Sequence, residues 1–183
     1  MSTIKITKEG DPILHGESVE VPASEITTPK IQKIIKDMST ALSKEKYGVA
    51  IAAPQIGIPL RIFVVAGSVF DRRRMHSDNS SPDQVFINPR ILKTSRRKQE
   101  SHESCLSIQG RPEKYGPDVA GIVKRPDKMT IEAYNEKGEK SERGASSFLA
   151  SIFDHEIDHL NGILFIDKTI DQWEIDSDFN KVG

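Results

Sequence analysis

The segment His155-Glu156-Ile157-Asp158-His159 carries the residues of this chain that are best suited to chemistry. On a helix, side chains four positions apart lie on one face, so both imidazoles could bind the same metal ion. Glu156 would lie about 100° around that helix from His155 and could reach a water molecule held by the metal. The spacing therefore predicts a metal-dependent hydrolase in which Glu156 accepts and donates protons.

A catalytic metal site of this kind needs a third protein ligand and a position left open for water. No histidine follows His159, so the third ligand must come from another part of the chain. The candidates are Cys105, Asp167, Glu174, His15, His76 and His102. The alternative to a metal site is a surface helix with two solvated histidines. The apolar residues Leu149, Ile152 and Phe153 argue against it, because they indicate a buried helix whose polar side chains need partners.

Three segments, in this order, resemble the signature motifs of the peptide deformylase family. They are Gly48-Val49-Ala50-Ile51-Ala52-Ala53-Pro54-Gln55, Glu103-Ser104-Cys105-Leu106-Ser107 and the His155–His159 segment. The resemblance extends from Gly10 to Phe165 and so covers nearly the whole chain. It implies a hydrolase that removes the N-formyl group from the N-terminal formylmethionine of nascent polypeptides.

The resemblance also implies a role for each matching residue. Cys105, His155 and His159 would bind the metal, and Glu156 would act as general acid/base. The Gln55 side chain and the backbone N–H of Leu106 would form an oxyanion hole. The implied metal is Fe²⁺, with Zn²⁺, Ni²⁺ or Co²⁺ able to replace it in purified protein. The implied partners are formylated nascent peptides, including those still on the ribosome.

Further residues are assigned by their places in the motifs. The expected substrate cleft is formed by Gly48, Val49, Ala50, Phe148 and Ile152. Glu103 is expected to pair with Arg125 and so to orient the loop that carries Cys105. The alternative is that both are ordinary surface charges.

The chain departs from the family pattern at several positions. Ala50 and Ser104 replace glycines, which is expected to narrow the cleft and to alter the turn before Cys105. Ser101 and Ser151 place hydroxyl groups where the family is commonly apolar. The stretch 109–120 is longer than usual and is expected to reshape the rim of the pocket.

Three alternatives to an active deformylase stay open on the sequence. One is a deformylase-like protein with an altered substrate or little activity. Another is a different metallopeptidase that uses Glu174 in place of Cys105. The last is a peptide- or ribosome-binding module with a structural metal, which would have no need of Glu156 as a base.

Composition limits the class of protein. A net charge of −1 and a pI of about 6.5 do not indicate nucleic-acid binding. The single cysteine excludes an intramolecular disulfide and is typical of a reducing compartment. No apolar run approaches the length of a membrane span, and no signal peptide is visible at the start. We expect a cytoplasmic protein, or the mature form of an organellar one.

The elements that must position these residues follow from hydrophobic periodicity. The sequence predicts an α+β fold with antiparallel or mixed sheets around a central helix that carries the His-Glu-x-x-His motif, in one catalytic domain over residues 1–183. One helix is expected from Pro29 with Thr28 as N-cap, and a second from Ser146 or Ser147 to Asn161-Gly162. Strands are expected at 4–6, 61–66, 84–88, 90–94, 119–124, 129–134 and 163–166. An exposed loop is expected at 67–83 and a hairpin turn at 135–138.

Overall fold

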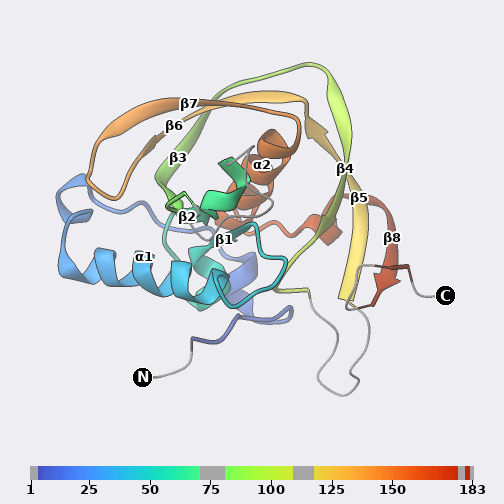
Figure 1. Ribbon diagram of the computed structural model, residues 1–183, viewed down its shortest axis with the longest axis horizontal. Coiled ribbons are helices and arrows are strands. Elements are labelled where there is room, and N and C mark those ends of the chain that lie inside the picture. Colours follow the sequence, from blue (N-terminus) through green and yellow to red (C-terminus); the bar gives the residue numbers. More distant parts are fainter. Residues whose placement is uncertain (1–3, 71–80, 109–117, 177–179, 182–183) are drawn as a thin grey trace.

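Two antiparallel sheets and two α-helices form the computed structural model (Figure 1), which describes residues 4–70, 81–108, 118–176 and 180–181. The five-stranded sheet has the order β1-β2-β3-β6-β7. Its strands are β1 (Ala50–Ala52), β2 (Ile62–Val65), β3 (Gln84–Thr94), β6 (Lys128–Tyr134) and β7 (Lys140–Ser146). The three-stranded sheet has the order β4-β5-β8, with β4 (Lys98–Ser104), β5 (Asp118–Pro126) and β8 (Thr169–Ile175). The helices are α1 (Pro29–Leu42) and α2 (Phe148–Leu160), so the fold class is α+β, as predicted.

The five-stranded sheet is covered by a different helix on each face. Successive side chains of a strand point to opposite faces, and β2 shows the consequence. Phe63 and Val65 belong to the apolar cluster that contains α2, whereas Ile62 and Val64 belong to the cluster that contains α1. All four side chains are fully buried. Because β2 is buried on both faces, α2 packs against one side of this sheet and α1 against the other.

The ends of α2 are set by backbone geometry rather than by side-chain caps. Ser147 occupies the N-cap position with φ 51°, and its side chain makes no cap hydrogen bond. At the other end, Gly162 has φ 73°, and a Cβ there would lie 2.6 Å from the carbonyl oxygen of His15. Glycine satisfies both constraints and ends the helix at the predicted place. No helix in the described ranges is long and apolar enough to cross a membrane.

Two predicted strands are absent, and two others are joined in one strand. Residues 4–6 form no strand, although the backbone N–H of Thr7 donates to the carbonyl oxygen of Gln55. In place of a strand at 163–166, a 3₁₀ helix spans Phe165–Asp167, and Asp167 accepts a hydrogen bond from the backbone N–H of Leu164. Segments 84–88 and 90–94 form one strand, β3, whose pairing with β6 shifts register around Asn88 (φ 52°).

Other elements were missed or lie outside the described residues. The strands β1, β4, β7 and β8 were not predicted, although the hairpin turn at 135–138 joins β6 to β7 as expected. Within the expected loop 67–83, Gly67–Phe70 form a 3₁₀ helix. Residues 71–80 of that loop, and most of the stretch 109–120, fall outside the described ranges.

Candidate metal centre and active-site cleft

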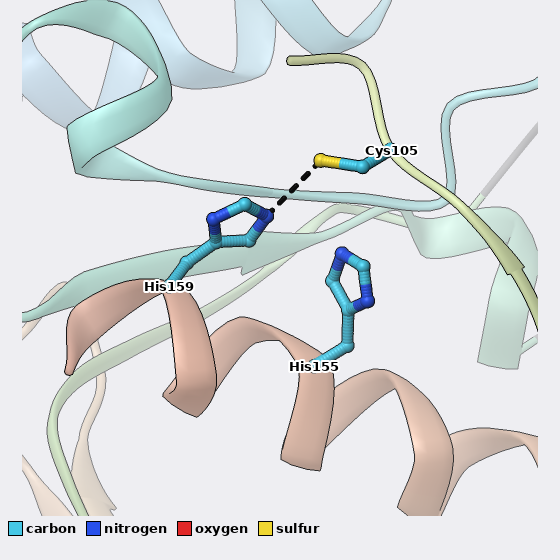
Figure 2. A group of neighbouring side chains, drawn as sticks. All are labelled: Cys105, His155 and His159. Carbon is cyan, nitrogen blue, oxygen red and sulfur yellow. Dashed lines mark hydrogen bonds between the residues drawn. The ribbon is translucent and has the colours of Figure 1, made fainter. Parts of the chain in front are cut away.

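Three side chains with metal-binding atoms converge from α2 and from the segment after β4 (Figure 2). His155 and His159 stand one turn apart on α2, and Cys105 approaches them from the chain that follows β4. Their candidate ligand atoms all lie within 4.8 Å of one another, and Cys105 Sγ is 3.2 Å from His159 Nε2. One sulfur and two nitrogen ligands are a set that divalent zinc or iron accepts, with a further position left for water.

None of the other described candidates for the third ligand joins the two histidines. Asp167 accepts from the Leu164 amide, and the His102 ring packs against Trp173 with 5.8 Å between centroids. Glu174 lies on β8, paired in register with Val119, and His15 ends a short 3₁₀ helix. His76 lies outside the described residues. Among the described residues, Cys105 is the candidate that joins the two histidines.

The electrostatics of the cluster favour a thiolate. Burial by itself would raise the pKa of Cys105, but His159 and a hydrogen bond from His155 outweigh it, so that pKa lies well below its usual value. Burial would likewise lower the pKa of His155, yet its hydrogen bonds with Cys105 and Glu103 raise it well above the usual value. In the metal-free protein these two shifts favour a thiolate at Cys105 and a proton on His155. A bound cation would replace that proton, because metal ligands must be unprotonated.

Glu103 connects the metal cluster to a buried arginine. Its Oε2 atom lies 2.9 Å from His155 Nδ1, and both of its oxygens accept from Arg125, with each N–O distance at 2.8 Å. Burial opposes ionisation of Glu103, but the hydrogen bonds from Arg125 and His155 lower its pKa to about 2. The contact at Nδ1 leaves Nε2 of His155 for a metal. The expected Glu103–Arg125 pair is therefore present, and Arg125 is not a surface charge, since its side chain is fully buried.

The arginine also holds two acidic residues of α2 that the sequence analysis missed. Arg125 Nη1 donates to Asp154 at 3.0 Å and to Asp158, and Lys168 Nζ reaches both oxygens of Asp158 at 2.8 and 2.9 Å. Asp154 and Asp158 are one helical turn apart, next to the ligand histidines. That i, i+4 acidic spacing is the signal that could have revealed them. Together these contacts fix α2 against β5.

Gln55 is held in a single orientation beside Cys105. Its Oε1 accepts from the Ala52 amide at 2.8 Å, which leaves Nε2 to donate toward Cys105 Sγ (3.4 Å) and Ser107 Oγ (3.3 Å). The side chain is 2% exposed. Ser107, the last residue of the second motif, is fully buried and accepts from this amide, although the sequence predicted no role for it. A donor whose direction is fixed before substrate arrives suits the stabilisation of a developing negative charge.

Glu156 has the properties of a proton carrier. It is 4% exposed, and within the part of the chain that the structure describes its Oε2 has no hydrogen-bond partner. Burial raises its pKa to about 7, against the attraction of His155 and His159. A carboxyl group that titrates near neutrality can accept a proton and release it again in the same cycle.

A cavity of about 590 Å³ opens onto these groups. Its walls include every residue expected to bind substrate, together with the reactive groups: Gly48, Val49, Ala50, Gln55, Ser101, Glu103, Cys105, Leu106, Phe148, Ser151, Ile152, His155 and Glu156. Ala50 lies in β1 and Ser104 in β4, and neither has a positive φ. The two missing glycines therefore cause no backbone strain, and the turn expected before Cys105 is an extended strand. A wider depression of about 970 Å³ over β3, β6 and β7 contains none of the candidate metal ligands.

Comparison with known proteins gives consistent matches. The family model for polypeptide deformylase matches residues 3–174. Peptide deformylase 2 of Clostridium acetobutylicum is 40% identical over 168 residues, covering 91% of this chain and 95% of that protein. Peptide deformylase 1A, chloroplastic/mitochondrial, of Arabidopsis thaliana is 34% identical over 177 residues, covering 91% of this chain and 61% of that protein.

Solved structures agree with the sequence matches. A class I type b peptide deformylase from Acinetobacter baumannii with bound Met-Ala-Ser superposes with a TM-score of 0.75 at 29% identity, covering 92% of this chain and 100% of that chain. A Plasmodium falciparum peptide deformylase in complex with an inhibitor gives a TM-score of 0.72 at 32% identity, covering 91% and 89%.

Proposed function

The chain belongs to the polypeptide deformylase family, and we propose that its cleft removes the N-formyl group from the N-terminal formylmethionine of nascent polypeptides. The observation that carries the proposal is the convergence of Cys105, His155 and His159 beside Glu156, in a cavity large enough for the start of a peptide. The bound Met-Ala-Ser of the similar Acinetobacter baumannii structure has the sequence of such a deformylated product.

The residues of the cluster fit a divalent metal ion. A low thiol pKa at Cys105 supplies a thiolate, and the contact between Glu103 and His155 Nδ1 presents the opposite ring nitrogen. When bound there, a divalent ion supplies a Lewis acid for the formyl oxygen and lowers the pKa of water. We assign Fe²⁺ as the ion in the cell, following the family resemblance, with Zn²⁺, Ni²⁺ or Co²⁺ as substitutes in purified protein.

Different groups of the protein carry out the separate steps of hydrolysis. Glu156 accepts a proton from the attacking water and delivers it to the departing amine nitrogen. Gln55 Nε2 and the backbone N–H of Leu106 donate to the oxygen on which negative charge develops. Val49, Ile152 and Phe148 form the apolar side of the cleft that receives the substrate. Arg125, through Glu103, keeps His155 oriented for its role.

The wider assignments belong to the same proposal. We take residues 1–183 as one catalytic domain with α2 as its central element, since the family match runs through both sheets and α2 contributes to the core and to the Arg125 contacts. The partners are formylated nascent chains at the ribosome. The cytoplasm is the compartment that supplies such chains, and an organellar matrix is the alternative.

The experiment is formate release from formyl-Met-Ala-Ser by protein loaded anaerobically with Fe²⁺. We expect turnover that a chelator abolishes and that Fe²⁺ restores. Protein that carries one metal ion per chain yet releases no formate would overturn the proposed activity.

A further inference from the structure

The wall of the cleft between β4 and α2 is lined by polar side chains. Along β4, Gln99, Ser101 and Glu103 are partly buried and alternate with exposed neighbours, so they share the inward face. The α2 side chains opposite them are Ser151 and His155, as the Gln99–Ser151 contact at 3.1 Å and the Glu103–His155 contact at 2.9 Å show. Ser101 lies between these two contacts on the strand.

Two hydroxyl groups on this wall have a proton that is not donated to any acceptor in the described residues. Ser151 Oγ accepts from Gln99 Nε2, but its own proton has no acceptor within the described residues. Ser101 makes no side-chain hydrogen bond within those ranges. Both residues line the cavity, and Ser151 is only 5% exposed. A hydroxyl carries one donor and two acceptor sites, so each can still donate to a group that enters the cavity.

The two serines lie as far from the reactive groups as the first side chain of a substrate would reach, an inference that rests on the proposed deformylation. Ser151 precedes His155 by one helical turn, about 6 Å. Ser101 precedes Glu103 by two strand positions, about 7 Å. With the formyl group next to Glu156 and Cys105, the side chain of the first residue extends along this wall.

We propose that Ser101 and Ser151 determine specificity, so that the cleft takes a first side chain of methionine length with an uncharged hydrogen-bond acceptor at its tip. Methionine sulfoxide has such an oxygen, whereas the thioether of methionine is a weak acceptor. An apolar tip would displace water from the two hydroxyl groups and leave their donors unpaired, which costs binding in the transition state. An anionic tip would leave water beside Glu103, whose guanidinium partner is already paired, and a cationic tip offers no acceptor.

The test is the ratio of kcat/KM for formyl-Met(O)-Ala-Ser to kcat/KM for formyl-norleucyl-Ala-Ser, in which Met(O) is methionine sulfoxide. We expect Ser101→Ala, which breaks no hydrogen bond of the free protein, to lower this ratio about three- to tenfold. Ser151→Ala should lower it similarly. Ser141→Ala, an exposed serine on β7, is the matched control and should leave the ratio unchanged. An unchanged ratio in both cleft variants would overturn the proposal.

A binding measurement separates this inference from the proposed reaction. Met(O)-Ala-Ser and Nle-Ala-Ser (Nle, norleucine), the corresponding product peptides, are titrated into metal-loaded protein and into Ser101→Ala. A preference for the sulfoxide that Ser101→Ala abolishes supports the wall as the determinant even if no peptide is turned over. Equal affinity for the two peptides in the unmodified protein contradicts it, whatever the activity on formyl-Met-Ala-Ser.

Discussion

Nδ1 of His155 lies 2.9 Å from Oε2 of Glu103, so one candidate metal ligand is oriented by a carboxylate on a different element. The carboxylate belongs to β4 and the imidazole to α2. Carboxylates of this kind fix the ring and raise its basicity as a ligand. The geometry of the metal centre therefore depends on the packing of the three-stranded sheet against α2.

Replacing Glu103 with Gln should weaken metal binding about 10- to 100-fold, because the neutral amide loses its charge-assisted contacts with His155 and Arg125. Competition with a chelator for Zn²⁺ measures the change. Glu100→Gln is the control, since Glu100 lies on the exposed face of the same strand. Equal affinities in the two variants would show that Glu103 does not support the metal site.

Arg125→Ala should lower the free energy of unfolding by about 3–5 kcal/mol, because three carboxylates would lose their shared buried partner. These are Glu103, Asp154 and Asp158. Urea unfolding of the metal-free protein provides the value. The exposed pair of Arg90 with Glu20 offers a control, and Arg90→Ala should have no measurable effect. A similarly small effect at Arg125 would mean that the buried network does not stabilise the fold.

Gln55→Glu should reduce kcat by about 10²–10³, since the carboxylate keeps an oxygen for the Ala52 amide but loses the donor beside Cys105. Bound metal should remain near one ion per chain. Steady-state formate release and metal analysis on the same sample distinguish the two quantities. Gln172→Glu, on the exposed surface of β8, is the control. A Gln55→Glu protein with full activity would remove Gln55 from the oxyanion hole.

The metal-free protein should lose stability through Glu156 as pH rises. Its folded pKa of about 7 exceeds the ordinary 4.5, so the native state favours the protonated form and loses that advantage between those two values. Glu156→Gln cannot titrate at this position and so lacks this dependence on pH. Between pH 4.5 and pH 7, the free energy of unfolding of the variant should therefore rise by roughly 3 kcal/mol relative to that of the unmodified protein. Unfolding curves at pH 4.5 and pH 8 measure it, with exposed Glu174→Gln as control. Parallel pH profiles for Glu156→Gln and the unmodified protein would contradict a raised pKa.

The helices were predictable from sequence because their apolar residues recur at helical spacing. The buried face of α1 consists of Ile31, Ile35, Met38 and Leu42, with Ala41 beside them, and α2 ends at the glycine that its geometry requires. The three motif segments likewise placed Cys105, His155 and Glu156 in the cleft. Local spacing was sufficient for these features.

The strand β4 was not predicted because its inward side chains are polar and belong to the active site. Strand prediction relies on alternation of apolar and polar residues, yet β4 alternates one polar set with another. Ser101 and Glu103 line the cleft, and Gln99 bonds Ser151 of α2. Functional sites are where such local rules are expected to fail. Besides Glu103, the partners of Arg125 were not predicted, since tertiary packing brings Asp154 and Asp158 to its guanidinium.

The predicted and observed strand boundaries differ at Pro89 and after Gly162. Separate strands were predicted at 84–88 and 90–94, but a register shift lets β3 continue through Pro89, and Asn88 bonds both the N–H and the carbonyl of Val21. After Gly162, the apolar residues that suggested a strand turn inward as a 3₁₀ helix in which Phe165 is buried. At Asn88 a contact with a distant segment fixes the local conformation, and after Gly162 the burial of Phe165 does so.

The most direct measurement compares formate release from formyl-Met-Ala-Ser by the unmodified protein and by Glu156→Gln, with bound metal determined in both. We predict one metal ion per chain in each protein and a rate about 10²–10⁴ lower in the variant, because the proton carrier is gone while the ligands remain. A Glu156→Gln protein that holds its metal and releases formate at the unmodified rate would contradict the account.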